Sequence, residues 1–433
     1  REEKGLKKSD LSRDEFMKYA WEWTDKYGGI ILNQLKRLGA SCDWDRTSFT
    51  MDDVRSKGVL KAFVDLYNRG KIYRGLRMIN WDPQAQTVLS NEEVIHGEEN
   101  AKLYKLKYVL EEDPSQSIVI STQRPETIMA DAAIAVHPDD ERYKHLVGKR
   151  VLIPLINKPI SIIIDDYVDI EFGTGALKVT PAHDINDYEL GKKHNLEVID
   201  ILNDDGSLND KAQILIGQDR FEARKSIIKL LEEADLVDGT IDYKTNIGRS
   251  ERTNAVVEPK LSLQWFVDMK SLAEPALDAV KSGDINFFPK NQVNTYTYWL
   301  DNIRDWCISR QLWWGHRIPA YYYGEDVFVG LDKEEIDAKA KSKFGADFDI
   351  SLLRQDEDVL DTWFSSWLWP ITVFNGFDDE EQYNYYVPTS VLVTGWDIIF
   401  LWVARMIMAN YEWKQEKPFN DVYFTGMVRD KQR

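Results

Sequence analysis

The sequence predicts an α/β protein whose middle third is a separate β-rich domain. Its 433 residues exceed what one compact core usually holds, so two or three domains are expected. Helical periodicity marks residues 12–70, short β-branched runs follow residue 103, and strands alternating with helices return after residue 259. The pattern of apolar residues changes near Gly97 and Gly248. These borders predict segments 1–97, 98–248 and 249–433.

The first segment is predicted to begin with a long helix. Ser12 and Glu15 form a capping box, and apolar residues then recur at helical spacing as far as Gly39. A break is expected at Gly28-Gly29, and Gly39 is the expected end. The apolar stripe predicts a face that turns inward.

A second helix and a strand follow. Thr50 and Asp53 are expected to open the helix, with Val59 and Phe63 on its inner face and Gly70 at its end. Residues 72–81 then read as a strand.

The middle segment is predicted to contain short strands and one helix. Asp219 and Glu222 lie in the first turn of that helix. The expected strands are β-branched runs separated by Asp, Pro and Gly, at residues 109–110, 118–120, 151–153 and 160–164.

The last segment combines an aromatic run with α/β alternation. Residues 387–395 predict a buried strand, residues 397–410 a helix, and residues 422–424 another strand. Open α/β sheets bind ligands where a strand turns directly into a helix. Asp397 lies at that turn, where it either caps the helix or holds a substrate ammonium group.

Residues 172–191 contain the densest cluster of candidate site residues. Gly173 and Gly175 predict a tight turn, residues 176–180 a short strand, and Pro181 its end. A helix should then begin, so polar side chains and free helix amides converge on one small volume.

Two carboxylates belong to the first turn of this helix. Asp184 is the expected N-cap and Asp187 follows three residues later, with Lys178 nearby in the sequence. Acids at such positions often serve only as caps. His183 with the two acids could also bind a metal, but no second His or Cys cluster completes a coordination shell, so no metal is expected.

The composition limits the classes of function. No apolar run is long enough to span a membrane, and Cys42 and Cys307 are far apart, which predicts a reduced, cytoplasmic setting. The net charge of −18 disfavours non-specific nucleic-acid binding, so any such contact must be local.

Several of these stretches resemble one family, the class I aminoacyl-tRNA synthetases of the Val/Ile/Leu branch. Thr122-Gln-Arg-Pro-Glu-Thr127 and Gly395-Trp-Asp-Ile-Ile-Phe-Leu-Trp-Val-Ala-Arg-Met406 are among the matching blocks, and the second resembles the valine-specific members. The other blocks are residues 38–44, 80–83, 172–191, 302–319 and 358–366.

The resemblance implies a Rossmann-type catalytic domain, incomplete here, that is split by an inserted β-rich editing domain. Such a domain hydrolyses threonyl-tRNA(Val). This product forms because an apolar valine pocket alone cannot exclude threonine. By resemblance, Asp187 would hold the α-ammonium group of the misattached amino acid. Asp184 and Lys178 would recognise the threonine hydroxyl and the ester region, and Phe172 would shape the pocket wall.

The same resemblance assigns residues 122–127 to the attacking water and the terminal adenosine of the tRNA acceptor end. Thr122, Arg124 and Thr127 would have these roles. The family usually has a second threonine where this chain has Gln123. That departure affects the water-positioning role of the stretch but leaves the location of the site unchanged.

In the catalytic part, the resemblance implies a site for L-valine. Asp397 would bind the amino group, and Trp363 and Ile398 would form the slot for the side chain. Some relatives carry Cys pairs near residues 82–86 and 248–254; these pairs are missing here, so no zinc is expected.

The parent enzyme would use ATP and Mg, but both ATP signatures of the class are missing from residues 1–433. The chain, which starts and stops within charged runs at residues 1–10 and 428–433, is therefore expected to be a fragment that cannot aminoacylate. Two alternatives remain. One is a fragment of an isoleucine-specific synthetase; the other is a tRNA-binding fragment without activity.

Overall fold

The computed structural model describes residues 10–428 and 430. Apart from residues 10, 428 and 430, the charged terminal runs lie outside this part. The chain divides into two compact units, one made of Arg1–Gly75 with Gln264–Arg433 and the other of Leu76–Leu263. Strands β1 (Ile72–Asp82) and β10 (Glu258–Val267) carry the chain from one unit to the other. The prediction of a strand at residues 72–81 is confirmed.

The long first helix forms, but two of its predicted features are wrong. Helix α1 (Arg13–Arg37) begins with both capping-box bonds of Ser12 and Glu15, and it runs through Gly28-Gly29 without a break. Each glycine lowers the stability of a helix by about 1 kcal/mol relative to alanine, and a helix of 25 residues tolerates two of them. None of its side chains is buried; Trp23 is 61% exposed. The stripe predicted to face inward is therefore only partly covered: Phe16 packs edge-on against Trp313, whereas Ile31 and Leu35 are exposed.

The end of α1 is as predicted. Gly39 has a φ of +81°, and the amide of Ala40 bonds back to the carbonyl of Leu35 while that of Gly39 bonds to Lys36. This pair of bonds is a Schellman motif, which requires the left-handed conformation that glycine adopts without strain.

The second helix, α2 (Asp53–Asn68), is capped by Asp52 and not by Thr50 as predicted. The Asp52 carboxylate accepts the amide of Arg55 at 2.8 Å, because the helix begins at Asp53 and not before it. Val59 and Phe63 are buried on its inner face, as predicted.

A parallel sheet defines the α/β character of this unit, and that prediction is confirmed. The strand order is β11 (Asn286–Phe288), β19 (Phe419–Thr425), β18 (Thr389–Gly395), and both pairings are parallel. Strand β18 was predicted to be buried, but Val391 and Val393 are more than half exposed. These two side chains, two positions apart, lie on the same face of β18, and that face is uncovered among the described residues.

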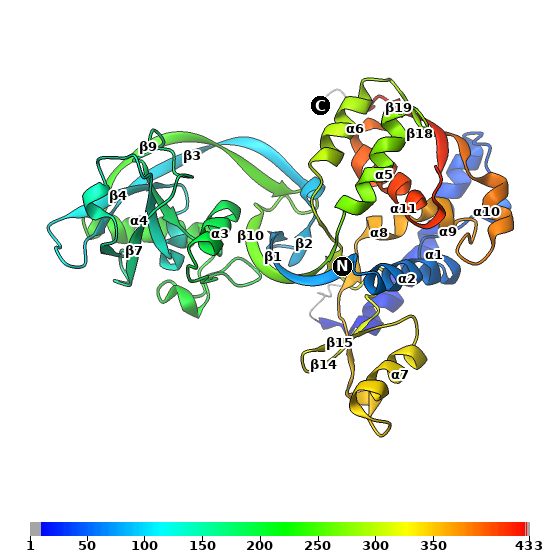
Figure 1. Ribbon diagram of the computed structural model, residues 1–433, viewed down its shortest axis with the longest axis horizontal. Helices are drawn as coiled ribbons and strands as arrows, with labels where there is room; N and C mark the ends of the chain where they lie inside the picture. The colour runs from blue at the N-terminus through cyan, green and yellow to red at the C-terminus, as the bar shows by residue number, and fades with distance from the viewer. Residues whose placement is uncertain (1–9, 429, 431–433) are drawn as a thin grey trace. The chain divides into compact units, whose positions relative to one another are not determined.

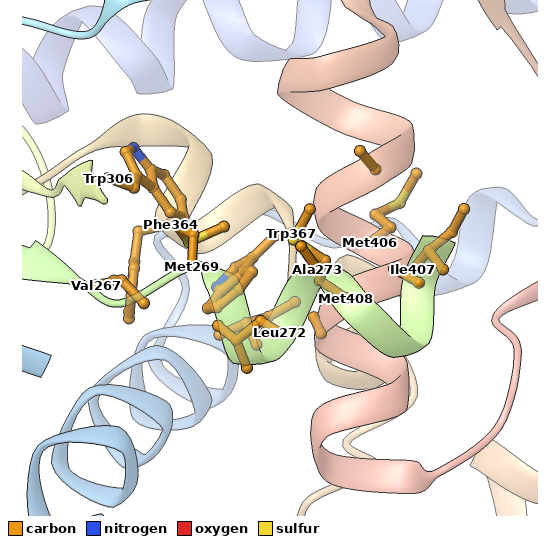
Figure 2. Packing of buried hydrophobic residues seen from close by; sticks show 14 of the residues in the cluster. Val267, Met269, Leu272, Ala273, Trp306, Phe364, Trp367, Met406, Ile407 and Met408 are labelled. Carbon is orange, nitrogen blue, oxygen red and sulfur yellow. The ribbon is translucent and has the colours of Figure 1, made fainter. Parts of the chain in front are cut away.

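Helices pack into a common core beside this sheet. Helices α5 (Lys270–Lys281) and α11 (Ala404–Lys414) contact one another through small and sulfur-containing side chains, as Figure 2 shows for Ala273, Met406 and Met408. The aromatic run predicted from the sequence contributes Trp306 and Trp367 to the same core.

Further helices and strands belong to the same unit. They are η2 (Trp44–Arg46), α6 (Gln292–Asp301), β12 (Trp306–Cys307), β13 (Ser309–Arg310), β14 (Ala320–Tyr323), β15 (Asp326–Val329), α7 (Lys333–Phe344), η7 (Ile350–Leu352), β16 (Arg354–Gln355), β17 (Val359–Leu360), α8 (Thr362–Ser366), α9 (Trp369–Thr372) and α10 (Glu380–Tyr386).

The other unit is β-rich, as predicted. Its long ribbon pairs β3 (Val94–Val109) with β9 (Val237–Ser250), and β4 (Ser117–Thr122) adds to β3 on the other side (Figure 1). Both ribbon strands are longer than the short runs predicted. Gly97 pairs with Ile247 inside the ribbon, so the changes of pattern seen in the sequence fall within these strands.

A second, four-stranded sheet follows the order β6 (Arg150–Leu152), β7 (Pro159–Ile164), β5 (Ala133–Val136), β8 (Ala176–Val179). The predicted strands and the helix capped by Asp219 are present. The elements are β2 (Thr87–Leu89), η3 (Asn91–Glu93), η4 (Pro125–Ala130), β5 (Ala133–Val136), η5 (Lys144–Leu146), β6 (Arg150–Leu152), β7 (Pro159–Ile164), β8 (Ala176–Val179), α3 (Ile185–Lys193), η6 (Asp210–Ala212) and α4 (Arg220–Glu233).

Candidate functional site

Strand β8 and helix α3 place the two predicted carboxylates. Pro181 ends the strand, and Asp184 is the N-cap of α3, accepting the amides of Asn186 at 2.8 Å and Asp187 at 3.1 Å. The predicted cap is confirmed. Asp184 is exposed, whereas Asp187 is 7% exposed, so the two acids have different environments.

Asp187 is a buried acid whose pKa lies near neutral pH. Its Oδ2 accepts the backbone amide of Thr180 at 2.8 Å. Burial, and then the nearby Asp184 carboxylate, raise the pKa of Asp187 to about 7, against the opposing effects of Lys178 and the Thr180 amide. A carboxyl group with such a pKa exchanges its proton near physiological pH, which is characteristic of functional sites.

The ammonium group of Lys178 makes three internal hydrogen bonds. Its Nζ donates to Asp131 at 3.0 Å, to Thr127 at 3.1 Å and to Thr180 at 2.5 Å. These three bonds use all three ammonium hydrogens. Asp131 also accepts the hydroxyls of Thr180 and Tyr108, and burial raises the pKa of its carboxyl.

The turn after β4 supplies the other predicted residues. The hydroxyl of Thr122 accepts the amide of Arg124 at 3.0 Å, and Thr127 donates to the Arg124 carbonyl at 2.9 Å. Both threonines are buried. They fold the chain around Arg124, and the Lys178–Thr127 bond ties this turn to β8.

The guanidinium of Arg124 joins three parts of the unit. Nε donates to Glu126 at 3.2 Å, Nη1 to the carbonyl of His183 at 3.0 Å, and Nη2 to Glu258. Although burial works against its charge, the Glu258 and Glu126 carboxylates raise the pKa of Arg124. Three of its five N–H groups are thus used internally, so at most two can reach a ligand.

Phe172 lies at the start of the tight turn predicted from the sequence. Its ring is 50% exposed and meets Tyr243 of β9 edge-on, with the centroids 6.1 Å apart. Gly173 and Gly175 have φ values of +62° and +75°. A Cβ on Gly175 would lie 2.9 Å from the carbonyl oxygen of Ile170, so this position has no room for a side chain.

His183 is held as a neutral ring. Burial, and then the charges of Arg124 and Lys178, lower its pKa well below the ordinary value. Its Nε2 accepts the amide of Ile201 at 3.2 Å. Across residues 10–428 and 430, no group of three or more His, Cys, Asp or Glu side chains is arranged to hold a metal ion.

The turns at residues 82–86 and 250–254 are joined through Asp82. This fully buried carboxylate accepts the hydroxyl of Thr253 at 2.7 Å and the amides of Gln84 and Ala85 at 2.9 Å each. Hydrogen bonds therefore link the two turns where some relatives were expected to carry cysteine pairs.

A groove borders the Arg124 turn. Its volume is about 850 Å³, and its lining includes Gln123, Lys102, Tyr104 and Phe221. The position at which the sequence departs from the family pattern thus faces an open space beside the candidate site.

The residues predicted to bind an amino acid lie in the unit that contains β18. Trp363 of α8 packs edge-on against Trp402, with the ring centroids 5.9 Å apart. Asp397 and Ile398 belong to the 3₁₀ turn η8 (Trp396–Ile398), which is followed by the π-helix η9 (Ile399–Val403). The prediction of one regular helix over residues 397–410 is therefore wrong, since the α-helix begins only at residue 404.

Asp397 is not the N-cap residue of η8, η9 or α11. A Cβ built on Gly395 would lie 2.4 Å from the Asp397 Oδ1, so this carboxylate lies directly over the glycine. The capping alternative for Asp397 is not supported.

Several residues of the candidate site escaped the sequence analysis. Thr180, Asp131 and Glu258 all contact the predicted residues, and the last two lie 47 and 134 positions from their partners. Thr180 alone carried a local signal, because it follows Lys178 by two positions at the end of the strand.

These features belong to a known family of enzymes. The model for tRNA synthetases class I (I, L, M and V) matches residues 1–433, so the chain belongs to this family and the resemblance seen in the sequence is confirmed. No helix in the described part of the chain is long and apolar enough to cross a membrane.

Similar proteins of known name are valine–tRNA ligases. A valine–tRNA ligase of Bacteroides fragilis is 59% identical over 431 residues, 99% of this chain and 49% of that protein. One of Chlorobaculum tepidum is 52% identical over 430 residues, 98% of this chain and 47% of that protein. This chain thus spans about half the length of these relatives.

Among solved structures, the agnB2 LeuRS of Agrobacterium radiobacter K84, in a ternary complex with tRNA and LeuAMS, is 18% identical. The match covers 95% of this chain and 56% of that one, at a TM-score of 0.43.

Proposed function

We propose that residues 76–263 form an editing domain that hydrolyses threonine from wrongly charged tRNA(Val), within a protein that is a valine–tRNA ligase. The observation that carries the proposal is Asp187, a buried acid with a pKa of about 7 at the N-terminal turn of α3. The similarity of the chain to the valine–tRNA ligases supports the choice of valine over isoleucine.

The need for such a site follows from physical chemistry. Threonine and valine have nearly the same shape, and an apolar pocket rejects an added hydroxyl by only about 10²-fold, a value measured for this kind of enzyme. A second pocket that pairs with the hydroxyl selects threonine, because valine would leave its polar groups unpaired.

The chemistry proposed is attack of a positioned water on the ester carbonyl. The Asp187 carboxylate pairs with the α-ammonium group and so fixes the ester relative to the turn at residues 122–127. The exposed Asp184 would accept the threonine hydroxyl. Since the hydrogens of Lys178 are all used, its role here is to hold Thr127 and Thr180 in place.

The acceptor end of the tRNA would approach along the groove of about 850 Å³. Tyr104 would offer an aromatic ring for an unpaired base, and Lys102 a positive charge for phosphate. Such a local site is compatible with a chain whose net charge is −18.

In the other unit, Asp397 would bind the amino group of L-valine, and Trp363 and Ile398 its side chain. ATP and Mg are proposed for the whole protein only. The residues directly after β18, at 396–398, offer Asp397 as their one charged group, which does not suit a polyphosphate. We therefore propose that this chain alone does not activate valine.

One experiment tests the editing proposal. The chain, at high concentration, is offered tRNA(Val) charged with threonine, tRNA(Val) charged with valine, and tRNA(Ile) charged with valine. Rapid loss of threonine alone is expected, and Asp187→Ala should abolish it. Asp166→Ala is the control for loss of an exposed carboxylate in the same unit, since that side chain is 79% exposed and pairs with Lys193.

The other outcomes identify the alternatives. Rapid loss of valine from tRNA(Ile) would indicate an isoleucine-specific synthetase. Binding of tRNA(Val) without loss of either amino acid would indicate a tRNA-binding fragment, and the editing proposal would be rejected. An ATP–pyrophosphate exchange signal with valine would reject the proposal that the chain cannot activate it.

A further inference from the structure

Glu258 is a buried acid at the first position of β10, and its two oxygens are divided between two arginines. One oxygen accepts Nη2 of Arg124, and the other lies 2.7 Å from Nε of Arg220. The residue is 5% exposed. A buried carboxylate between two guanidinium groups is held in position, and its removal would leave both arginines without the anion that they share.

Arg124 connects the two halves of the candidate site. It immediately precedes the turn that carries Thr127, and its Nη1 holds the carbonyl of His183, the residue before the Asp184 cap. Movement of this guanidinium would therefore shift the turn relative to the start of α3. Glu258 supplies the bond that fixes Nη2.

We infer that Glu258 is a positioning residue for deacylation, acting through Arg124 to hold the turn at residues 122–127 against the N-terminus of α3. The inference rests on the proposed editing function. The neutral amide of a Glu258→Gln variant would leave Arg124 and Arg220 facing each other without the charge that separates them. Glu126 remains on Nε, so the turn would loosen but not unfold.

The test compares steady-state deacylation of threonyl-tRNA(Val) by the wild-type chain, Glu258→Gln and Glu258→Asp. Because misplacement of about 1 Å can cost roughly 10²-fold, kcat is expected to fall about 100-fold in Glu258→Gln while KM stays within about twofold. The aspartate variant keeps the charge and should recover part of the rate. Glu93→Gln is the matched control, since Glu93 is similarly buried and pairs with Arg252.

A double-mutant cycle separates positioning from general stability. If Glu258 acts through Arg124, the Glu258→Gln change should add little in an Arg124→Gln background, whereas a merely structural role would give additive losses. Equal losses in Glu93→Gln and Glu258→Gln, or full additivity, would overturn the inference.

A readout that needs no activity keeps the two proposals distinguishable. The Nη2–H resonance of Arg124, assigned by its disappearance in Arg124→Gln, should exchange with solvent at least about tenfold faster in Glu258→Gln and unchanged in Glu93→Gln, because Glu258 accepts the bond from Nη2. If the wild-type chain does not deacylate, the editing function fails and this measurement alone decides the positioning. Unchanged exchange, or faster exchange with undiminished kcat, would overturn the inference.

Discussion

Asp187 makes the stability of its unit depend on pH in a direction opposite to that of an ordinary salt-bridged acid. Its pKa is about 7 in the folded chain, against an ordinary value of 3.8. Between these values the folded state binds a proton that the unfolded state lacks. The resulting stability is present below about pH 4 and is lost as the pH rises through about 7.

Replacing Asp187 by asparagine removes this dependence and keeps an oxygen for the Thr180 amide. The shift of about 3 units, at 1.36 kcal/mol each, sets an upper limit on the order of 4 kcal/mol for the change in relative stability. The Asp187→Asn variant is therefore expected to gain stability over the wild type as the pH rises from about 4 to about 8.

The assay must report on this unit alone. Trp81 is the one tryptophan between residues 76 and 263 out of fifteen, so bulk fluorescence would follow the other unit. Urea unfolding is better followed by pulsed hydrogen exchange, at one pulse pH, in peptides from residues 176–194. A stability difference between wild type and Asp187→Asn that stays constant over the pH window would refute the reasoning.

Three further substitutions have definite expected outcomes. Lys178→Met leaves the fully buried Asp131 carboxylate without its ammonium partner and should destabilise the unit by about 3–5 kcal/mol in the same assay; a loss below about 1 kcal/mol would show that the ion pair is dispensable. Gly175→Ala should cost roughly 1–3 kcal/mol, because φ is +75° and the Ile170 carbonyl is too close; retained stability would contradict the assigned turn. Gly29→Ala, with nothing within 4 Å of the new Cβ, should stabilise α1 by about 1 kcal/mol in thermal unfolding followed by circular dichroism, and no gain would argue against a continuous helix.

Local chemistry made part of the site predictable. Asp184 was identified because the capping interaction is completed within three residues, and Gly39 because its conformation ends a helix within the same turn. Asp131 and Glu258 could not be found in this way. Their partners are distant in the sequence, and nothing in the neighbouring residues marks them as buried acids.

The same distinction explains the errors in the fold. Periodicity reveals the apolar stripe of α1, but what covers a stripe is decided by tertiary contacts, so Ile31 was wrongly expected to face inward. The π-helical turn Ile399–Val403 has no sequence signal of its own, and a regular helix was predicted across it.

The three internal bonds of Arg124 affect how mutants at this position are interpreted. Arg124 lies between two threonines of the candidate site and is an obvious target for alanine scanning. An inactive alanine variant would ordinarily be interpreted as having lost a contact with the substrate. Here such a result would report mainly the collapse of a scaffold, since the guanidinium is already occupied by Glu126, Glu258 and the His183 carbonyl. Loss of activity in an alanine variant at residue 124 therefore reports the loss of these internal bonds before it reports a catalytic role.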